Sequence, residues 1–140
     1  MSINDYEPDN ALKFIETGVV DSVQVIYNIF EQAPEERLFL AWNAKASGVT
    51  VRGVLDEGGL IRQIRADTVF PEGDFRENYF RGERKREVEE RAGRIVEDLN
   101  IAPDALAETA LRFALSTRRS PPSSRCAMSN AIVRSVMVLA

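Results

Sequence analysis

The sequence contains no histidine and a single cysteine, Cys126, and these shortages exclude several kinds of chemistry. A lone cysteine cannot form a disulfide within the chain, and without histidine the usual zinc-ligand spacings are absent. We therefore expect no metal site. Cysteine usage of this kind is typical of a reducing compartment, which predicts a cytoplasmic protein.

Long apolar runs and a large excess of one charge are also missing. No segment approaches the roughly 20 apolar residues of a membrane span, and residues 1–10 lack the basic and apolar regions of a signal peptide. The formal net charge of -4 offers no hint of a nucleic acid or an anionic membrane as a partner. We expect neither partner. With 140 residues, 44% of them hydrophobic, the chain can build the core of one modest domain.

Signals for helices and strands alternate in the first half of the chain. Residues 7–18 and 33–48 begin with proline and acidic residues and end at glycine, which predicts two helices. Residues 21–30 and 49–55 are apolar and rich in β-branched residues, which is typical of strands buried on both faces of a parallel sheet. The apolar face of the first helix would carry Ala11, Phe14 and Ile15.

The second half predicts a long loop followed by two helices. Residues 56–82 show no clear period, whereas 83–100 and 102–115 have helical patterns. The buried stripe of the charged helix over 83–100 would be Val88, Ala92, Ile95 and Leu99. Two strands are too few for a stable parallel sheet, so the elements indicate part of a larger α/β fold.

Three segments carry a resemblance to a known family. "DNALKFIETGVVDSVQVIYNIFEQAPEERLF", "GVTVRGVLDEGGL" and "ADTVFPEGDFRENYFRGERK" resemble the C-terminal half of a bacterial NADPH-dependent aldo-keto reductase. The resemblance implies a partial (β/α)₈ TIM barrel over residues 1–115, the C-terminal half only, because a full barrel of this type needs about 250 residues.

The resemblance also implies a set of cofactor contacts. Ser2 and Asn4 would end the fifth strand near the nicotinamide carboxamide of NADP(H). Gln24, on the sixth strand, would hydrogen-bond the carboxamide, and Tyr27 would stack on the nicotinamide ring. Leu55 and Gly58, in the loop after the seventh strand, would lie at the pyrophosphate. That loop lies at the C-terminal ends of the barrel strands, where barrel active sites are found.

The catalytic residues of this family are absent from the chain. The family reduces carbonyl compounds with an aspartate, a tyrosine acid, a lysine and a histidine carried on the first four strands. Tyr6, Tyr27 and Tyr79 do not match that tyrosine motif. We therefore expect an aldo/keto reductase by family, an oxidoreductase of small carbonyl substrates, in a fragment that is inactive alone. The alternative is a non-catalytic half-barrel that associates with a partner through exposed apolar faces.

The end of the chain departs from the family pattern. Residues 116–140 contain paired arginines, paired prolines and Cys126 where the eighth strand and the 2′-phosphate turn should follow. With suitable synonymous codons, residues 120–137 encode "VSTVIPVRNVKRNCTVSD" one base out of register. We interpret 116–140 as an aberrant, disordered tail created by a frameshift.

Two further features leave alternatives open. The segment "FPEGDFRENYF" (70–80) is either a substrate lid or a packing loop. Asp56 and Glu57 resemble a pair of catalytic carboxylates, but adjacent residues at a strand end point to opposite sides, which argues against a general acid/base pair.

Overall fold

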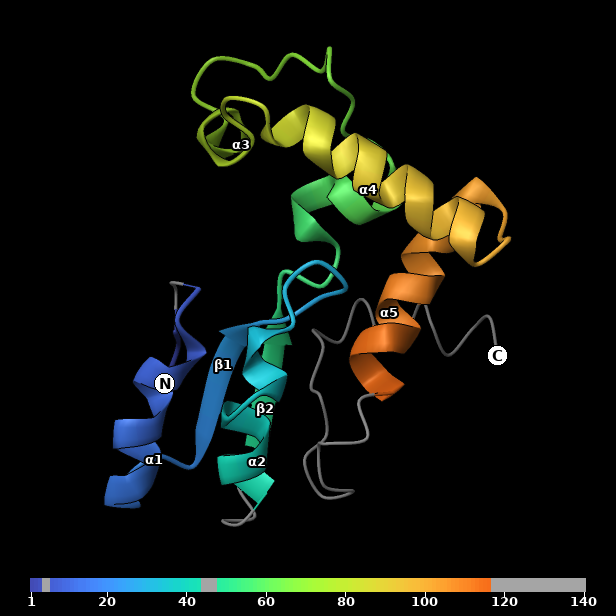
Figure 1. The fold of residues 1–140 in the computed structure, drawn as a ribbon. Helices are drawn as coiled ribbons and strands as arrows, with labels where there is room; N and C mark the ends of the chain where they lie inside the picture. Colours follow the sequence, from blue (N-terminus) through green and yellow to red (C-terminus); the bar gives the residue numbers. More distant parts are fainter. Residues whose placement is uncertain (4–5, 44–47, 117–140) are drawn as a thin grey trace. The chain divides into compact units, whose positions relative to one another are not determined.

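A computed structural model describes residues 1–3, 6–43 and 48–116. The chain divides into two compact units (Figure 1). Of the described residues, unit 1 comprises those of Met1–Val54 and of 111–116, and unit 2 comprises Leu55–Ala110. The tail after Ser116, with Cys126, lies outside the described residues, so its interpretation as a frameshift product stays a prediction.

Unit 1 contains short helices and two strands. Its elements are η1 (Pro8–Ala11), α1 (Leu12–Thr17), β1 (Ser22–Ile26), η2 (Ala33–Glu35), α2 (Leu38–Asn43) and β2 (Gly48–Arg52). As expected, the first helix ends at Gly18, which has a left-handed φ of 71°. The second helix does not reach Gly48 as predicted, because Gly48 already pairs with Ser22 as the first residue of β2.

The two strands are parallel and pair in register from Ser22↔Gly48 to Ile26↔Arg52. The expected parallel pair is therefore confirmed. On the other side of β1, Ser2 forms a parallel bridge with Gln24, through Ile3 N to Gln24 O (2.8 Å) and Gln24 N to Met1 O (2.8 Å). The N-terminal residues thus extend the sheet beyond β1.

Strand β1 is shorter than the apolar run 21–30 predicts. Asn28 is buried, and its Oδ1 accepts hydrogen bonds from the backbone N–H groups of Phe30 (2.8 Å) and Glu31 (3.0 Å). This side chain turns the backbone out of the strand. Its Nδ2 donates to Gly53 O (2.8 Å), which ties the ends of the two strands together.

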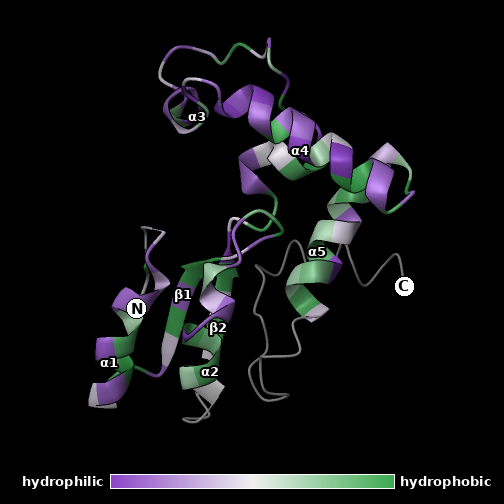
Figure 2. Ribbon diagram, in the orientation of Figure 1, coloured by the Kyte–Doolittle hydropathy of each residue, from purple (hydrophilic) through white to green (hydrophobic). Residues whose placement is uncertain are grey.

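The core of unit 1 is apolar, and a large part of β1 is coloured as hydrophobic (Figure 2). Its buried side chains include Ala11, Ile15, Val23, Val25, Tyr27, Leu38, Phe39, Val49 and Val51. The prediction that Phe14 shares the buried face of the first helix is wrong, because Phe14 is 49% exposed. The helix has only six residues after η1, so Ala11 and Ile15 suffice to cover its buried side.

Unit 2 is helical. Its elements are η3 (Asp56–Ile61), α3 (Phe75–Tyr79), α4 (Arg84–Asp98), η4 (Pro103–Ala105) and the first turns of α5 (Leu106–Ser116). The expected loop over 56–82 therefore contains two helical segments. The helix α3 has five residues, too few to show a period, and begins where Asp74 Oδ1 accepts from Arg76 N (2.9 Å).

The buried stripe of α4 differs from the predicted one. Val88, Ala92 and Val96 are buried, whereas Ile95 is half-buried and Leu99 is 54% exposed. The helix ends at Asp98, and Asn100 takes a left-handed φ of 49°. The spacing of four along Val88, Ala92 and Val96 therefore sets the buried face, and Leu99 lies beyond it. In the part of the chain that is described, no helix has the length and apolar character needed to cross a membrane.

Candidate functional site

Ser2 and Gln24 lie side by side in unit 1. Their strands are adjacent and parallel, and Ser2 Oγ donates to Gln24 Oε1 at 3.2 Å. Gln24 is half-buried, and Ser2 is exposed. The sheet thus presents a primary amide, oriented by a hydroxyl, at a position that a small molecule could reach. Asn4, the third predicted carboxamide contact, lies outside the described residues.

The strand register adds one polar residue that the sequence interpretation missed. Thr50 pairs with Gln24, and paired residues of neighbouring strands point to the same face of a sheet. Thr50 is half-buried, like Gln24. Ser2, Gln24 and Thr50 therefore form a polar row across three adjacent chain segments. The two-residue period of the strands would have predicted this row, had the register been known.

Tyr27 does not belong to this row. It is fully buried at 0% exposure, together with Val23 and Val25, on the face of β1 opposite Gln24. Its ring lies nearly parallel to Phe113 at 5.5 Å and meets Phe39 at 70° and 5.1 Å. Its hydroxyl donates to Glu35 Oε1. The structure therefore gives Tyr27 a packing role in place of the predicted stacking on a nicotinamide ring.

Leu55 and Gly58 lie in one turn of unit 2. Gly58 N and Leu60 N both donate to Leu55 O at 3.1 Å, which closes the turn. Gly58 has a φ of 110°, a conformation that L side chains rarely adopt. Its own N–H is already bonded within the chain. In the predicted phosphate contact, Gly58 would therefore act by allowing the backbone to form this turn and not by donating its N–H.

The turn also contains two non-glycine residues with positive φ. Asp56 has a φ of 46° and Glu57 a φ of 51°. Such conformations cost on the order of 1–3 kcal/mol each and persist only where the surrounding structure holds them. The turn therefore depends on contacts with the surrounding structure.

A buried cluster of three side chains supports the turn. Asp56 is 2% exposed, and its Oδ1 accepts from Tyr79 Oη (2.6 Å) and from Arg84 Nη2 (3.2 Å). The Arg84 guanidinium lies over the Tyr79 ring at 4.7 Å. The three residues come from η3, the end of α3 and the start of α4. Nothing in the sequence pattern joins them, since Tyr79 and Arg84 lie 23 and 28 residues after Asp56.

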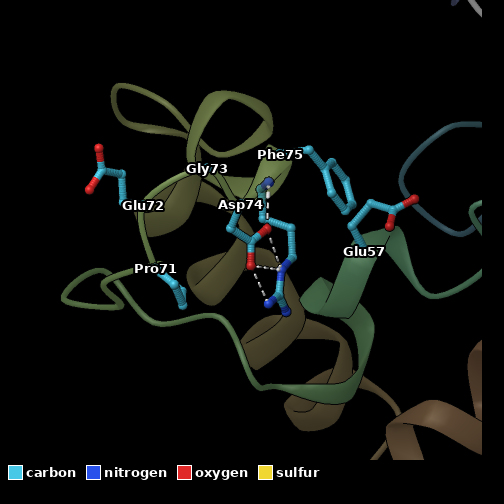
Figure 3. A pocket seen from close by; sticks show the side chains of 7 residues that line it. Glu57, Pro71, Glu72, Gly73, Asp74 and Phe75 are labelled. Atoms are coloured by element: carbon cyan, nitrogen blue, oxygen red, sulfur yellow. Dashed lines mark hydrogen bonds and ion pairs between the residues drawn. The ribbon is translucent and has the colours of Figure 1, made fainter.

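The second half of the predicted carboxylate pair lies elsewhere. Glu57 is half-buried and is one of the residues that line an open hollow (Figure 3). The hollow has a volume of about 640 Å³. Asp56 is instead enclosed in the cluster. The two carboxylates therefore do not form a general acid/base pair. The sequence argument, that adjacent residues at a strand end point to opposite sides, had spoken against such a pair. The remaining residues that line the hollow are Pro71, Glu72, Gly73, Asp74, Phe75 and Arg76.

The hollow contains an internally neutralised ion pair. Arg76 donates to both carboxylate oxygens of Asp74, with the shortest contact 2.6 Å from Nη2 to Oδ2. These side-chain bonds, and then the Arg76 backbone N–H, hold the pKa of Asp74 below its ordinary value. Glu72 and Glu57 lie on opposite sides of Asp74 (Figure 3). Among the described residues, no group of histidine, cysteine, aspartate or glutamate side chains could hold a metal ion.

The segment 70–80 packs at its two ends. Phe80 is fully buried, and its ring stacks with that of Phe70 at 5.8 Å. Phe75, in the middle, is 62% exposed. The sequence left two roles open for this segment, a packing loop and a substrate lid. The structure shows the packing, and the lid stays a prediction.

Comparison with known proteins supports the fold. No protein-family model matches the sequence, and no curated protein matches it. The structure is similar to the glycerol dehydrogenase AKR11B4 from Gluconobacter oxydans, an aldo-keto reductase, with a TM-score of 0.57 and 18% identity. The match covers 91% of this chain and 45% of that one. The chain thus has a mixed fold of helices and strands that is similar to part of the fold of that enzyme, and it spans less than half of that enzyme's length.

Proposed function

We propose that the chain is the cofactor-binding half of an NADP(H)-dependent aldo/keto reductase and that it is catalytically inactive alone. The observation that carries this proposal is the pairing of Ser2 with Gln24 in a fold similar to part of an aldo-keto reductase barrel. The predicted cytoplasmic location and the carbonyl substrate belong to the same proposal.

The polar row fits the carboxamide of the cofactor. A carboxamide has one acceptor and two donor hydrogens, and the Gln24 amide offers the complementary set. Ser2 Oγ holds the Gln24 oxygen at 3.2 Å, which limits the rotation of the amide. Thr50, in register with Gln24, adds a hydroxyl on the same face. When bound, NADP(H) would supply the hydride for carbonyl reduction, and this chain's part is to orient the nicotinamide.

Inactivity follows from the missing proton donor. The chain has no histidine, and it lacks the motifs that carry the catalytic tyrosine and lysine in the aldo-keto reductase family. Of the three described tyrosines, Tyr27 bonds Glu35 in the core and Tyr79 bonds Asp56, so neither of these hydroxyls is placed to protonate a substrate. The third, Tyr6, is exposed and does not match the family's catalytic motif. Without a positioned acid, the rate gain of about 10²–10⁴ that general acid catalysis supplies is lost.

The test is an NADPH titration of the purified full chain, followed by its fluorescence. We expect saturable binding, weakened by about tenfold in Gln24→Ala, which corresponds to the loss of about 1.4 kcal/mol. Gln32→Ala is the matched control, because it removes the same amide from an exposed side chain whose Nε2 donates locally to Ile29 O. Binding unaffected by Gln24→Ala, or absent in the wild type, would contradict the proposal.

The activity assay follows NADPH oxidation with a panel of aldehydes. We expect no turnover above the uncatalysed rate by the chain alone. Reduction of any aldehyde that persists in Gln32→Ala and is lost in Gln24→Ala would show an intact enzyme, and the inactivity would then be wrong.

A second function, a non-catalytic half-barrel that associates with its complement, is favoured by the exposed apolar side chains of unit 1. Phe14, Val19 and Leu40 are 49%, 79% and 52% exposed. Exposed apolar surface of this kind often marks an interaction site. Sedimentation of the chain alone and with a chain carrying the first four strands would test it. A stable complex with the complement, and not with an unrelated half-barrel, is the expected result.

A further inference from the structure

A second hollow in unit 2 differs in charge from the one beside Asp74. Its volume is about 220 Å³, and all of its lining residues belong to unit 2. They are Thr68, Val69, Phe70, Glu77, Phe80, Arg81, Gly82 and Lys85. Arg81 and Lys85 bring two positive charges and Glu77 one negative charge, which leaves a net charge of +1. The hollow beside Asp74 is instead lined by three carboxylates and one guanidinium.

The two cations of the second hollow are not neutralised by a carboxylate. Within the part of the chain that the structure describes, neither Arg81 nor Lys85 forms an ion pair, and Arg81 Nη1 lies 3.5 Å from Asn78 Oδ1. Lys85 Nζ donates to Thr68 O at 2.9 Å. Because an ammonium group has three N–H donors, Lys85 keeps two for a further partner.

Other arginines close by in the sequence behave differently. Arg76, Arg84 and Arg86 each pair with a carboxylate, at 2.6, 3.2 and 2.7 Å. Carboxylates are therefore plentiful around this part of the chain, yet the two cations that line the second hollow have none within ion-pair distance among the described residues. An anion from solution would supply the missing charge.

Part of the lining is apolar. Phe70 and Phe80 stack at 5.8 Å with their ring planes 18° apart, and Phe80 is fully buried. Val69 is 89% exposed although its side chain is apolar. The lining at Gly82 is open, since a Cβ built there would meet no atom within 4 Å. A ligand in this hollow would thus meet both positive charge and hydrocarbon.

We propose that the second hollow binds a small organic monoanion, a carboxylate with a short aliphatic chain. The net charge of +1 matches one carboxylate, whereas a phosphate dianion would leave excess negative charge beside Glu77. Arg81 offers the planar fork of N–H donors that suits a carboxylate, and Lys85 adds a second donor group. The aliphatic chain lies against Val69 and Phe70. The ligand is small, because pockets for drug-sized molecules have volumes of roughly 300–1,000 Å³.

The experiment titrates the full chain with sodium butyrate at constant ionic strength and follows the backbone amide signals by NMR. We expect saturable shifts at residues 68–70 and 81–85, with a Kd in about the millimolar range. Butylamine has the same chain and the opposite charge, so it should cause no saturable shift at these residues. Inorganic phosphate, at a pH at which it is a dianion, should bind about fivefold more weakly than butyrate.

Four variants assign the binding to the second hollow. Arg81→Gln and Lys85→Gln should each raise the butyrate Kd about fivefold, the effect of one charge contact near a surface. Glu77→Gln removes the opposing charge and should lower the Kd about twofold to threefold. Arg86→Gln is the matched control, because Arg86 is an exposed cation of α4 outside the hollow, and its Kd should stay within about 1.5-fold of the wild type.

Several results would overturn the proposal. Butyrate without saturable shifts would remove the site, and equal shifts with butylamine would show an apolar surface that does not select charge. Tighter binding of phosphate than of butyrate would exclude a carboxylate as the preferred ligand. Equal losses of affinity in Arg81→Gln and Arg86→Gln would show attraction to the whole positive surface. The comparison of the three probes uses the wild-type chain alone, so it decides even where a variant does not fold.

Discussion

Tyr27 offers a sharp test of the core of unit 1. Its ring is fully buried between Phe39 and Phe113, and its hydroxyl donates to Glu35. Tyr27→Phe keeps the ring contacts and removes the hydroxyl that donates to Glu35. We therefore expect this variant to fold and to report the contribution of the Tyr27 hydroxyl to stability.

The expected loss of stability follows from the two groups that form the hydrogen bond. A hydrogen bond to a charged group contributes about 1.5–3 kcal/mol. Glu35 is half-buried and recovers part of its hydration when the hydroxyl is removed, so the lower end of that range applies. We expect Tyr27→Phe to lower the free energy of unfolding by about 1–2 kcal/mol. Tyr27→Ala also removes both aromatic contacts and should cost about 3–5 kcal/mol, a large part of the stability of a small domain.

The assay is urea denaturation followed by far-ultraviolet circular dichroism, applied to Tyr27→Phe, Glu35→Gln and the double variant. The coupling energy of that cycle should be about 1–2 kcal/mol. Tyr6→Phe is the control, because Tyr6 is 44% exposed, and its effect should stay within about 0.5 kcal/mol. A coupling energy near zero, or equal effects at Tyr27 and Tyr6, would refute the reasoning.

The other predictions concern unit 2. Val96→Ala should lower the stability by about 1–2 kcal/mol and Leu99→Ala by less than about 0.5 kcal/mol, because Val96 is 9% and Leu99 54% exposed; equal losses in thermal denaturation would contradict the α4 packing. The pKa of Asp74 is lowered by Arg76, and that of Glu89 by the Ala66 N–H and then by Arg65. Both carboxylates therefore stabilise the fold above their ordinary pKa values, and that stabilisation is lost as the pH falls through the lowered ones. Carbon-detected NMR titration should show both lowered pKa values, with that of Asp74 returning toward its ordinary value in Arg76→Gln.

Much of the fold of unit 1 follows from the sequence because its signals are local. Gly18 stops the first helix through its left-handed φ, and the two β-branched runs form the expected parallel pair. The predictions are wrong where a single side chain, which the hydrophobic pattern does not take into account, changes the course of the backbone. Asn28 ends β1 four residues before the apolar run does, through bonds to Phe30 N and Glu31 N. An asparagine inside an apolar run carries no periodic signal that would mark such a turn.

The candidate site also has one part that the sequence predicts and one part that it does not. Ser2 and Gln24 were predicted together, and the structure brings them into hydrogen-bond contact. The cluster around Asp56 was not predicted, because its members are brought together by the packing of η3 against α4 and by the end of α3. A charged residue that follows a strand is ordinarily expected to be exposed. Only the three-dimensional arrangement shows that Tyr79 and Arg84 make burial of Asp56 favourable.

The two-residue period of β1 explains why one predicted site residue has a different role. Gln24 and Tyr27 are three positions apart, and the pairing continues to Tyr27, whose N–H donates to Arg52 O at 3.2 Å. An odd separation along an extended strand places two side chains on opposite faces, so Gln24 and Tyr27 cannot both face one ligand. The face of Gln24 carries Ser2 and Thr50, and the face of Tyr27 carries the core. A ligand that contacts the Gln24 amide would therefore also meet the hydroxyl groups of Ser2 and Thr50, which lie on the two neighbouring chain segments.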